Sequence, residues 1–191
     1  MKQIIIINAY PYEEPFSWEL QKRYKTGALA AGHSVAEIFL KDLRFDLNLS
    51  MGYRKLPELE PDLKMAQEEI TKANHLVFIY PVWWGTYPAL MKGFIDRVFL
   101  PGFAFKFLPG QEHEKYLQGK SARLLVNLDS SLWVHKYNMS SPGETALKTA
   151  TLEFCGVSPV KISYFPELRR ASQSLKQQWF SKMESLGKKA E

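Results

Sequence analysis

The order of apolar strand-type segments and helical segments constrains the fold of this chain more than any other feature, because the two types alternate five times. Strand-type segments are predicted at 3–8, 34–40, 76–80 and 122–128, and within 157–165. Helical segments are predicted at 16–31, 61–73, 88–99 and 141–154, and at a final stretch that contains Leu175 and Leu186. Such alternation favours a parallel sheet with helices on both faces and right-handed crossovers.

The first strand-type segment supports this arrangement, because positions 4–7 are all isoleucine. A strand that is apolar at every position is typical of a parallel sheet covered on both faces. Five strands fit the doubly wound, flavodoxin-like order 2-1-3-4-5, and 191 residues suit one domain, which we take as residues 1–191. The connection at 101–119 shows no clear strand or helix, and long loops of this kind tend to be functional.

Composition limits the possible partners and location of the chain. Hydrophobic residues make up 46% of it, which is enough for a full core. The net charge of +5 is spread among acidic residues, so we expect no nucleic-acid partner. No segment approaches the roughly 18 apolar residues of a membrane span, and no signal-peptide core is visible, so a cytoplasmic location is expected. Cys155 is the single cysteine, and its apolar neighbours indicate a buried, inert thiol.

Three predicted loops follow strand ends and converge where the strand order reverses, which is where doubly wound sheets bind ligands. They read "NAYPYEEPFSW" at 8–18, "PVWWGTY" at 81–87 and "DSSLWVHKY" at 129–137. Glycine-rich dinucleotide and triphosphate motifs are absent, as are a hydrolase elbow and metal-ligand spacing. The aromatic rings, hydroxyls and backbone N–H groups of the loops suit a flat aromatic ligand with polar edges and a phosphate, such as FMN.

The ends of that ligand can be assigned to particular loops. Its phosphate is expected at the N-terminus of the first helix, where free N–H groups favour anions and Ser17 is a candidate N-cap. Trp83 and Trp84 either cap the core or wall the ligand site, and Gly85, which permits close backbone approach, favours the second interpretation. The turn at 129–131 is either ordinary or part of the site, and His135 is expected at the surface.

The segment "YPVWWGTYPALMKGFIDRVFLPGFAF" at 80–105 resembles the signature region of the flavodoxin-like NAD(P)H dehydrogenases, the quinone reductase family. The matching positions are Pro81, Trp84, Pro88, Ala89, Lys92, Gly93, Asp96, Arg97, Val98, Gly102, Phe103 and Ala104. The resemblance extends to "IIIINAYP" near the start of the chain and to "LEFCGV" before the last strand.

This resemblance implies an oxidoreductase with bound FMN, or alternatively FAD, and with NADH or NADPH as reductant. A hydride would pass through flavin N5 to a quinone or similar small acceptor in a ping-pong scheme, with sites at a homodimer interface. The implied cofactor-binding residues are Tyr10, Phe16, Ser17, Trp18, Pro81, Val82, Trp83, Trp84, Gly85, Asp129, Ser130, Ser131 and Trp133. Phe105 and Phe107 would line the substrate side.

Three other interpretations remain open. A flavodoxin-type electron carrier would usually be acidic, whereas this chain is basic. A regulatory or ancillary subunit, such as the quinone reductase-like proteins of potassium-efflux systems, would depend on contact with a partner more than on turnover. A relative that has lost its flavin is the third, because the first loop reads Tyr10-Pro11 where the family often has a His-Pro pair.

Overall fold

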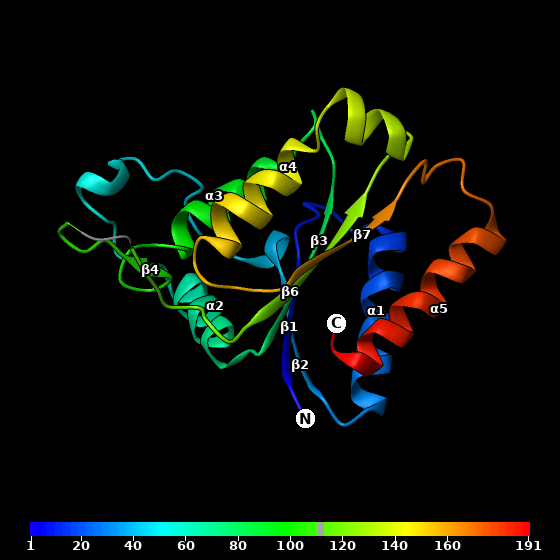
Figure 1. Ribbon diagram of the computed structural model, residues 1–191, viewed down its shortest axis with the longest axis horizontal. Helices are drawn as coiled ribbons and strands as arrows, with labels where there is room; N and C mark the ends of the chain where they lie inside the picture. The colour runs from blue at the N-terminus through cyan, green and yellow to red at the C-terminus, as the bar shows by residue number, and fades with distance from the viewer. Residues whose placement is uncertain (111–112) are drawn as a thin grey trace.

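The computed structural model describes residues 1–110 and 113–191, and a five-stranded parallel sheet forms its centre (Figure 1). Its strands are β1 (Gln3–Asn8), β2 (Ser34–Phe39), β3 (His75–Pro81), β6 (Ser121–Asn127) and β7 (Val160–Phe165). They lie in the order β2-β1-β3-β6-β7, and every neighbouring pair is parallel. The predicted doubly wound order 2-1-3-4-5 is therefore confirmed, with β6 and β7 as the fourth and fifth strands of the sheet.

Helices cover both faces of the sheet, as predicted (Figure 1). On one face lie α1 (Pro15–Ala30) and α5 (Gln173–Lys189). On the other face lie α2 (Pro61–Lys72), α3 (Ala89–Val98) and a helix that starts as α4 (Pro142–Glu144) and continues with π-helical hydrogen bonds over Thr145–Glu153. No helix among the described residues is long and apolar enough to cross a membrane.

The isoleucines of β1 explain how one strand serves two cores. Ile5 and Ile7 belong to the core that faces α2 and α3, whereas Ile4 and Ile6 belong to the core that faces α1 and α5. Successive side chains of a strand point to opposite faces, so an unbroken apolar run is needed when both faces are covered. All four side chains are buried, which agrees with the prediction from the sequence.

Two glycines allow α1 and α5 to touch backbone to backbone. A Cβ added at Gly27 would lie 2.0 Å from the carbonyl oxygen of Glu184, and one added at Gly187 would lie 2.0 Å from that of Tyr24. Real side-chain carbons cannot approach so closely, so both positions require glycine. This close contact fixes α5 against the helix that starts beside the first predicted loop.

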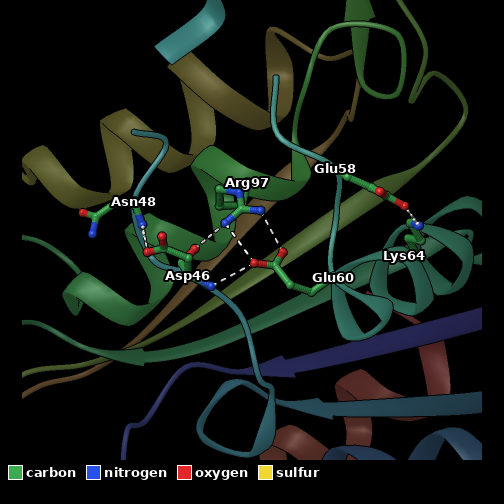
Figure 2. A network of polar contacts seen from close by, with 6 residues as sticks. All are labelled: Asp46, Asn48, Glu58, Glu60, Lys64 and Arg97. Carbon is green, nitrogen blue, oxygen red and sulfur yellow. Dashed lines mark hydrogen bonds and ion pairs between the residues drawn. The ribbon is translucent and has the colours of Figure 1, made fainter. Parts of the chain in front are cut away.

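The irregular segment between β2 and α2 is anchored by the arginine of the family-like motif (Figure 2). Arg97 is 2% exposed; its Nη1 donates to the carbonyl oxygen of Asp46 at 2.6 Å, and its Nη2 donates to Glu60 Oε2 at 2.7 Å. Glu60 Oε1 also accepts from the Asp46 N–H at 3.0 Å. A planar guanidinium suits this multidentate geometry, so α3 and the segment before α2 are held together by one side chain.

The connection at 101–119 differs from the prediction, because its described part contains strands. β4 (Phe105–Lys106) pairs in antiparallel fashion with β5 (Glu114–Lys115). Residues 111–112 of this connection lie outside the described residues. Strands of two residues are too short to show a two-residue periodicity, so sequence pattern alone does not reveal them.

Candidate functional site

Two cavities lie near the residues that the sequence singles out. The larger, of about 650 Å³, is mainly apolar and lies beside α3 and the helix at 142–153. The smaller, of about 300 Å³, lies at the carboxyl edge of the sheet and is lined by Tyr10, Tyr12, Glu14, Phe16, Pro81, Val82, Trp83, Asn127, Leu128, Asp129, Leu168, Arg169 and Lys176. Doubly wound sheets bind ligands at this edge, where the order reverses between β1 and β3, so the smaller cavity is the candidate cofactor site.

The double tryptophan forms a tight turn at the mouth of this cavity. The Trp83 N–H donates to Thr86 O at 2.7 Å, and the Thr86 N–H donates to Trp83 O at 3.0 Å. Between them, Trp84 and Gly85 have φ values of 50° and 80°, as in a type I′ turn. Trp83 stacks on Tyr12 with ring centroids 6.4 Å apart, whereas Trp84 is 100% exposed. The turn thus places one indole on the cavity wall and the other in solvent.

The same turn limits which backbone groups can meet a ligand. The Val82 N–H donates to Asn127 O at 2.9 Å, and the Trp83 N–H is taken by Thr86. Among the described residues, the N–H groups of Trp84 and Gly85 have no intramolecular acceptor. Of the predicted ring contacts from Val82 to Gly85, only the last two N–H groups therefore remain available as donors.

Asn127, which the sequence analysis missed, supplies a buried polar atom to the cavity wall. Its Nδ2 donates to the Tyr10 hydroxyl at 2.6 Å, but its Oδ1 is buried and accepts no hydrogen bond from the described residues. Burial raises the pKa of Tyr10, so this phenol stays protonated at neutral pH. A buried carbonyl oxygen without a donor is costly, so Asn127 Oδ1 is a candidate acceptor for an N–H or O–H group of a ligand.

The N-terminus of α1 differs from the prediction that Ser17 caps it. Glu14 is the N-cap: its Oε2 accepts from the Ser17 N–H at 2.6 Å, and Ser17 Oγ donates to Glu14 O at 3.0 Å. Ser17 is buried and is already the third residue of the helix, so it cannot act as the cap. Pro15 occupies the first helical position, where its lack of an N–H is tolerated. A carboxylate therefore lies where the phosphate was expected.

Three cavity residues that the sequence analysis left out follow β7: two lie in the connection to α5, and the third lies near the start of α5. They are Leu168, Arg169 and Lys176. Arg169 Nη2 lies 3.1 Å from Asp129 Oδ2, and both side chains are largely exposed. The end of the fifth strand meets the same edge of the sheet as the other strand ends, and this topological rule was the available signal.

The structure divides the predicted cofactor residues into two groups. Tyr10, Phe16, Pro81, Val82, Trp83 and Asp129 line the smaller cavity. Outside its lining lie Ser17, Trp18, Trp84, Gly85, Ser130, Ser131 and Trp133. The Trp18 ring packs on Phe39 with centroids 6.1 Å apart, and Ser131 Oγ accepts from the Val134 N–H at 3.3 Å. These two contacts serve local packing and a turn.

Phe105 and Phe107 lie in the larger cavity, with ring centroids 5.2 Å apart. The two cavities share no lining residue, so these rings and Trp83 do not face one pocket within a single chain. Cys155 also lines the larger cavity, and burial raises the pKa of its thiol to about 12. The predicted burial of this thiol is confirmed, and the raised pKa favours its protonated, less reactive form.

His135 is not the surface residue that the sequence suggested. It is fully buried, and its Nε2 lies 2.7 Å from Glu144 Oε1. This contact ties the π-helical turn at Val134–Asn138 to the start of α4, and so shapes the third predicted loop. Among residues 1–110 and 113–191, no group of His, Cys, Asp and Glu side chains has the arrangement of a metal site.

The fold and the cavity at the switch point define a doubly wound protein with a cofactor-type site. The chain belongs to the family described as flavodoxin-like fold, whose model matches residues 2–185. Ribosyldihydronicotinamide dehydrogenase (quinone) of Pongo abelii is 31% identical over 163 residues, which cover 82% of this chain and 66% of that protein. An NAD(P)H oxidoreductase of Haemophilus influenzae, itself uncharacterized, is 25% identical over 138 residues, or 69% of this chain and 68% of that protein.

A solved structure has the same fold over nearly the whole chain. Smu.1420 of Streptococcus mutans UA159 is 28% identical, with a TM-score of 0.83 over 98% of this chain and 99% of that one. The resemblance to flavodoxin-like NAD(P)H quinone reductases, drawn from the segment at 80–105, is confirmed by these comparisons.

Proposed function

We propose that this chain is a flavin-dependent NAD(P)H oxidoreductase that passes a hydride to a quinone or similar small acceptor. The observation that carries the proposal is the unsatisfied Oδ1 of Asn127 in a cavity at the switch point of the sheet. The names of the relatives from Pongo abelii and Haemophilus influenzae support the same class of reaction. A flavin bound there would supply hydride transfer, and the protein would supply binding, orientation and electrostatics.

The ring end of the cavity fits a flavin. The ring imide and ribityl hydroxyls are donors for Asn127 Oδ1 in the cavity wall. The isoalloxazine edge has acceptor atoms for the free N–H groups of Trp84 and Gly85, which lie in the turn at the cavity mouth and not in the lining. Trp83 stacked on Tyr12 forms an aromatic wall that excludes water from the ring.

The acceptor side needs a second copy of the chain. The larger cavity is mainly apolar, and Phe107 and Tyr53 at its rim are 66% and 64% exposed. We propose a two-fold homodimer in which this side of each copy lies against the Trp83 turn of the other copy, since the family resemblance implies sites at the subunit interface. Light scattering of the parent protein should give a dimer, and Phe107→Glu should shift it toward monomer. A monomeric parent at tens of micromolar contradicts the dimer.

Flavin titration tests the function directly. The purified protein should bind FMN at micromolar concentration and oxidise NADH or NADPH when a quinone is added. Asn127→Leu should weaken FMN binding, because it removes the acceptor oxygen, whereas Asn127→Asp keeps an oxygen at that position. Tyr10→Phe is the matched control, since it removes the hydroxyl that bonds Asn127 Nδ2 but leaves Oδ1 in place. Failure to bind either FMN or FAD would refute the proposal.

A further inference from the structure

We infer that Glu14 competes with the phosphate of the flavin for the N-terminus of α1, so that this protein discriminates little between FMN and riboflavin. The inference rests on the proposed function and concerns the end of the cavity that does not fit the cofactor. Helix N-termini bind phosphate through the free N–H groups of their first turn, assisted by the helix dipole.

The first turn of α1 has few of those groups left. Pro15 occupies the first helical position and has no N–H. The Ser17 N–H is taken by Glu14 Oε2 at 2.6 Å, and the Trp18 N–H donates to Glu14 O at 3.1 Å. Among the described contacts, the Phe16 N–H is the one donor of this turn without an acceptor. A phosphate must therefore displace the Glu14 carboxylate to gain a second N–H of this turn.

Charge in the cavity opposes the phosphate as well. Glu14 and Asp129 line the cavity with Arg169 and Lys176, so its lining carries two acidic and two basic side chains. One of the two cations, Arg169, already lies 3.1 Å from the Asp129 carboxylate. A phosphate with nearly two negative charges would therefore bind where no excess positive charge neutralises it. It would also lie next to the Glu14 carboxylate, which caps the same helix and would repel it.

An uncharged polar group in the cavity wall gives independent evidence for a ligand. Asn127 is 3% exposed, and its Oδ1 lacks a donor at the wall of the same cavity. This acceptor suits an uncharged N–H or O–H group of the kind that the flavin ring and ribityl chain share. Recognition should thus depend on the part that FMN and riboflavin have in common.

Titration of FMN and riboflavin, followed by quenching of flavin fluorescence, tests this inference. The parent should bind the two flavins with dissociation constants within about threefold of each other. Glu14→Ser keeps a good N-cap but removes the charge, and should tighten FMN binding about tenfold with riboflavin unchanged. Glu14→Gln, a second variant that retains the side-chain length, should shift FMN in the same direction. Glu19→Gln is the control, because it removes an equal charge from the same helix outside the cavity.

Each outcome decides a different question. If both flavins bind but Glu14→Ser and Glu14→Gln leave the ratio of FMN to riboflavin affinity as in the parent, the competition is refuted and the proposed function stands. A parent that binds FMN far more tightly than riboflavin also refutes it. If neither flavin binds to parent or variants, both the competition and the proposed function fail. Thermal unfolding of each variant verifies that the fold is retained.

Discussion

Replacing Trp84 with asparagine should stabilise the protein, although it removes the largest side chain of the loop. Trp84 has a φ of 50°, and the left-handed region costs an ordinary L-residue roughly 1–2 kcal/mol. Its side chain is 100% exposed, so no burial is lost. Asparagine tolerates this region, and asparagine followed by glycine is the favoured pair of a type I′ turn. The expected gain is about 1 kcal/mol in the free energy of unfolding.

The gain can be measured by urea denaturation and by thermal unfolding. For a chain of this length, about 1 kcal/mol corresponds to a rise of roughly 2–4 °C in Tm. Trp83→Asn is the matched control: Trp83 is 41% exposed and stacks on Tyr12, so its loss should destabilise by about 1 kcal/mol. If Trp84→Asn unfolds more easily than the parent, Trp84 makes a stabilising contact and the argument from its exposure is wrong.

Three further changes test other parts of the structure. Arg97→Met should lower the free energy of unfolding by roughly 3 kcal/mol in urea denaturation, because Glu60 loses its buried partner; no loss would contradict the role of the network. Gly85→Val should weaken FMN binding in a titration, because φ is 80° and the new Cβ would lie 3.1 Å from Met139 Cε; unchanged affinity would exclude this turn from the ring site. Burial and nearby cations lower the pKa of His75 to about 3, so below pH 6.5 the unfolded state binds the proton and the folded state does not. As the pH is lowered from 6.5 toward 3, the free energy of unfolding should fall by about 1.4 kcal/mol per pH unit through this histidine. His75→Gln should reduce this slope in denaturation curves measured at several pH values.

The sheet could be predicted from the sequence because its signal is repeated and local. The four isoleucines of β1 require cover on both faces, and the alternation of segments leaves little choice of topology. Gly32, predicted to end the first helix, has a φ of 79° just after α1. Each of these signals depends only on residues that are close in the sequence, so the predicted strands and helix ends hold in the folded structure.

Only about half of the candidate site could be predicted, because its lining depends on contacts between residues that are far apart in the sequence and on which side chain takes each hydrogen bond. Ser17 is a good N-cap by type, but the cap position lies three residues earlier, where the Glu14 side chain caps the helix by accepting from the Ser17 N–H. Arg169 follows a strand end more than eighty residues beyond Trp83, and no motif surrounds it, so the rule that parallel strand ends meet at one edge was its one signal. Asn127 lay inside the strand predicted at 122–128, and the structure shows that it is the last residue of β6, at the carboxyl edge of the sheet.

The separation of the aromatic rings into two cavities follows from the length of α3. Trp83 precedes this helix and Phe105 and Phe107 follow it, so they appear close in the sequence. A helix of 10 residues spans about 15 Å, which carries the two groups to different cavities. Both groups can face one acceptor only if they come from different copies. A two-fold axis that places the Phe107 side of one copy near the Trp83 turn of the other repeats the contact twice, so one isologous interface would complete both sites.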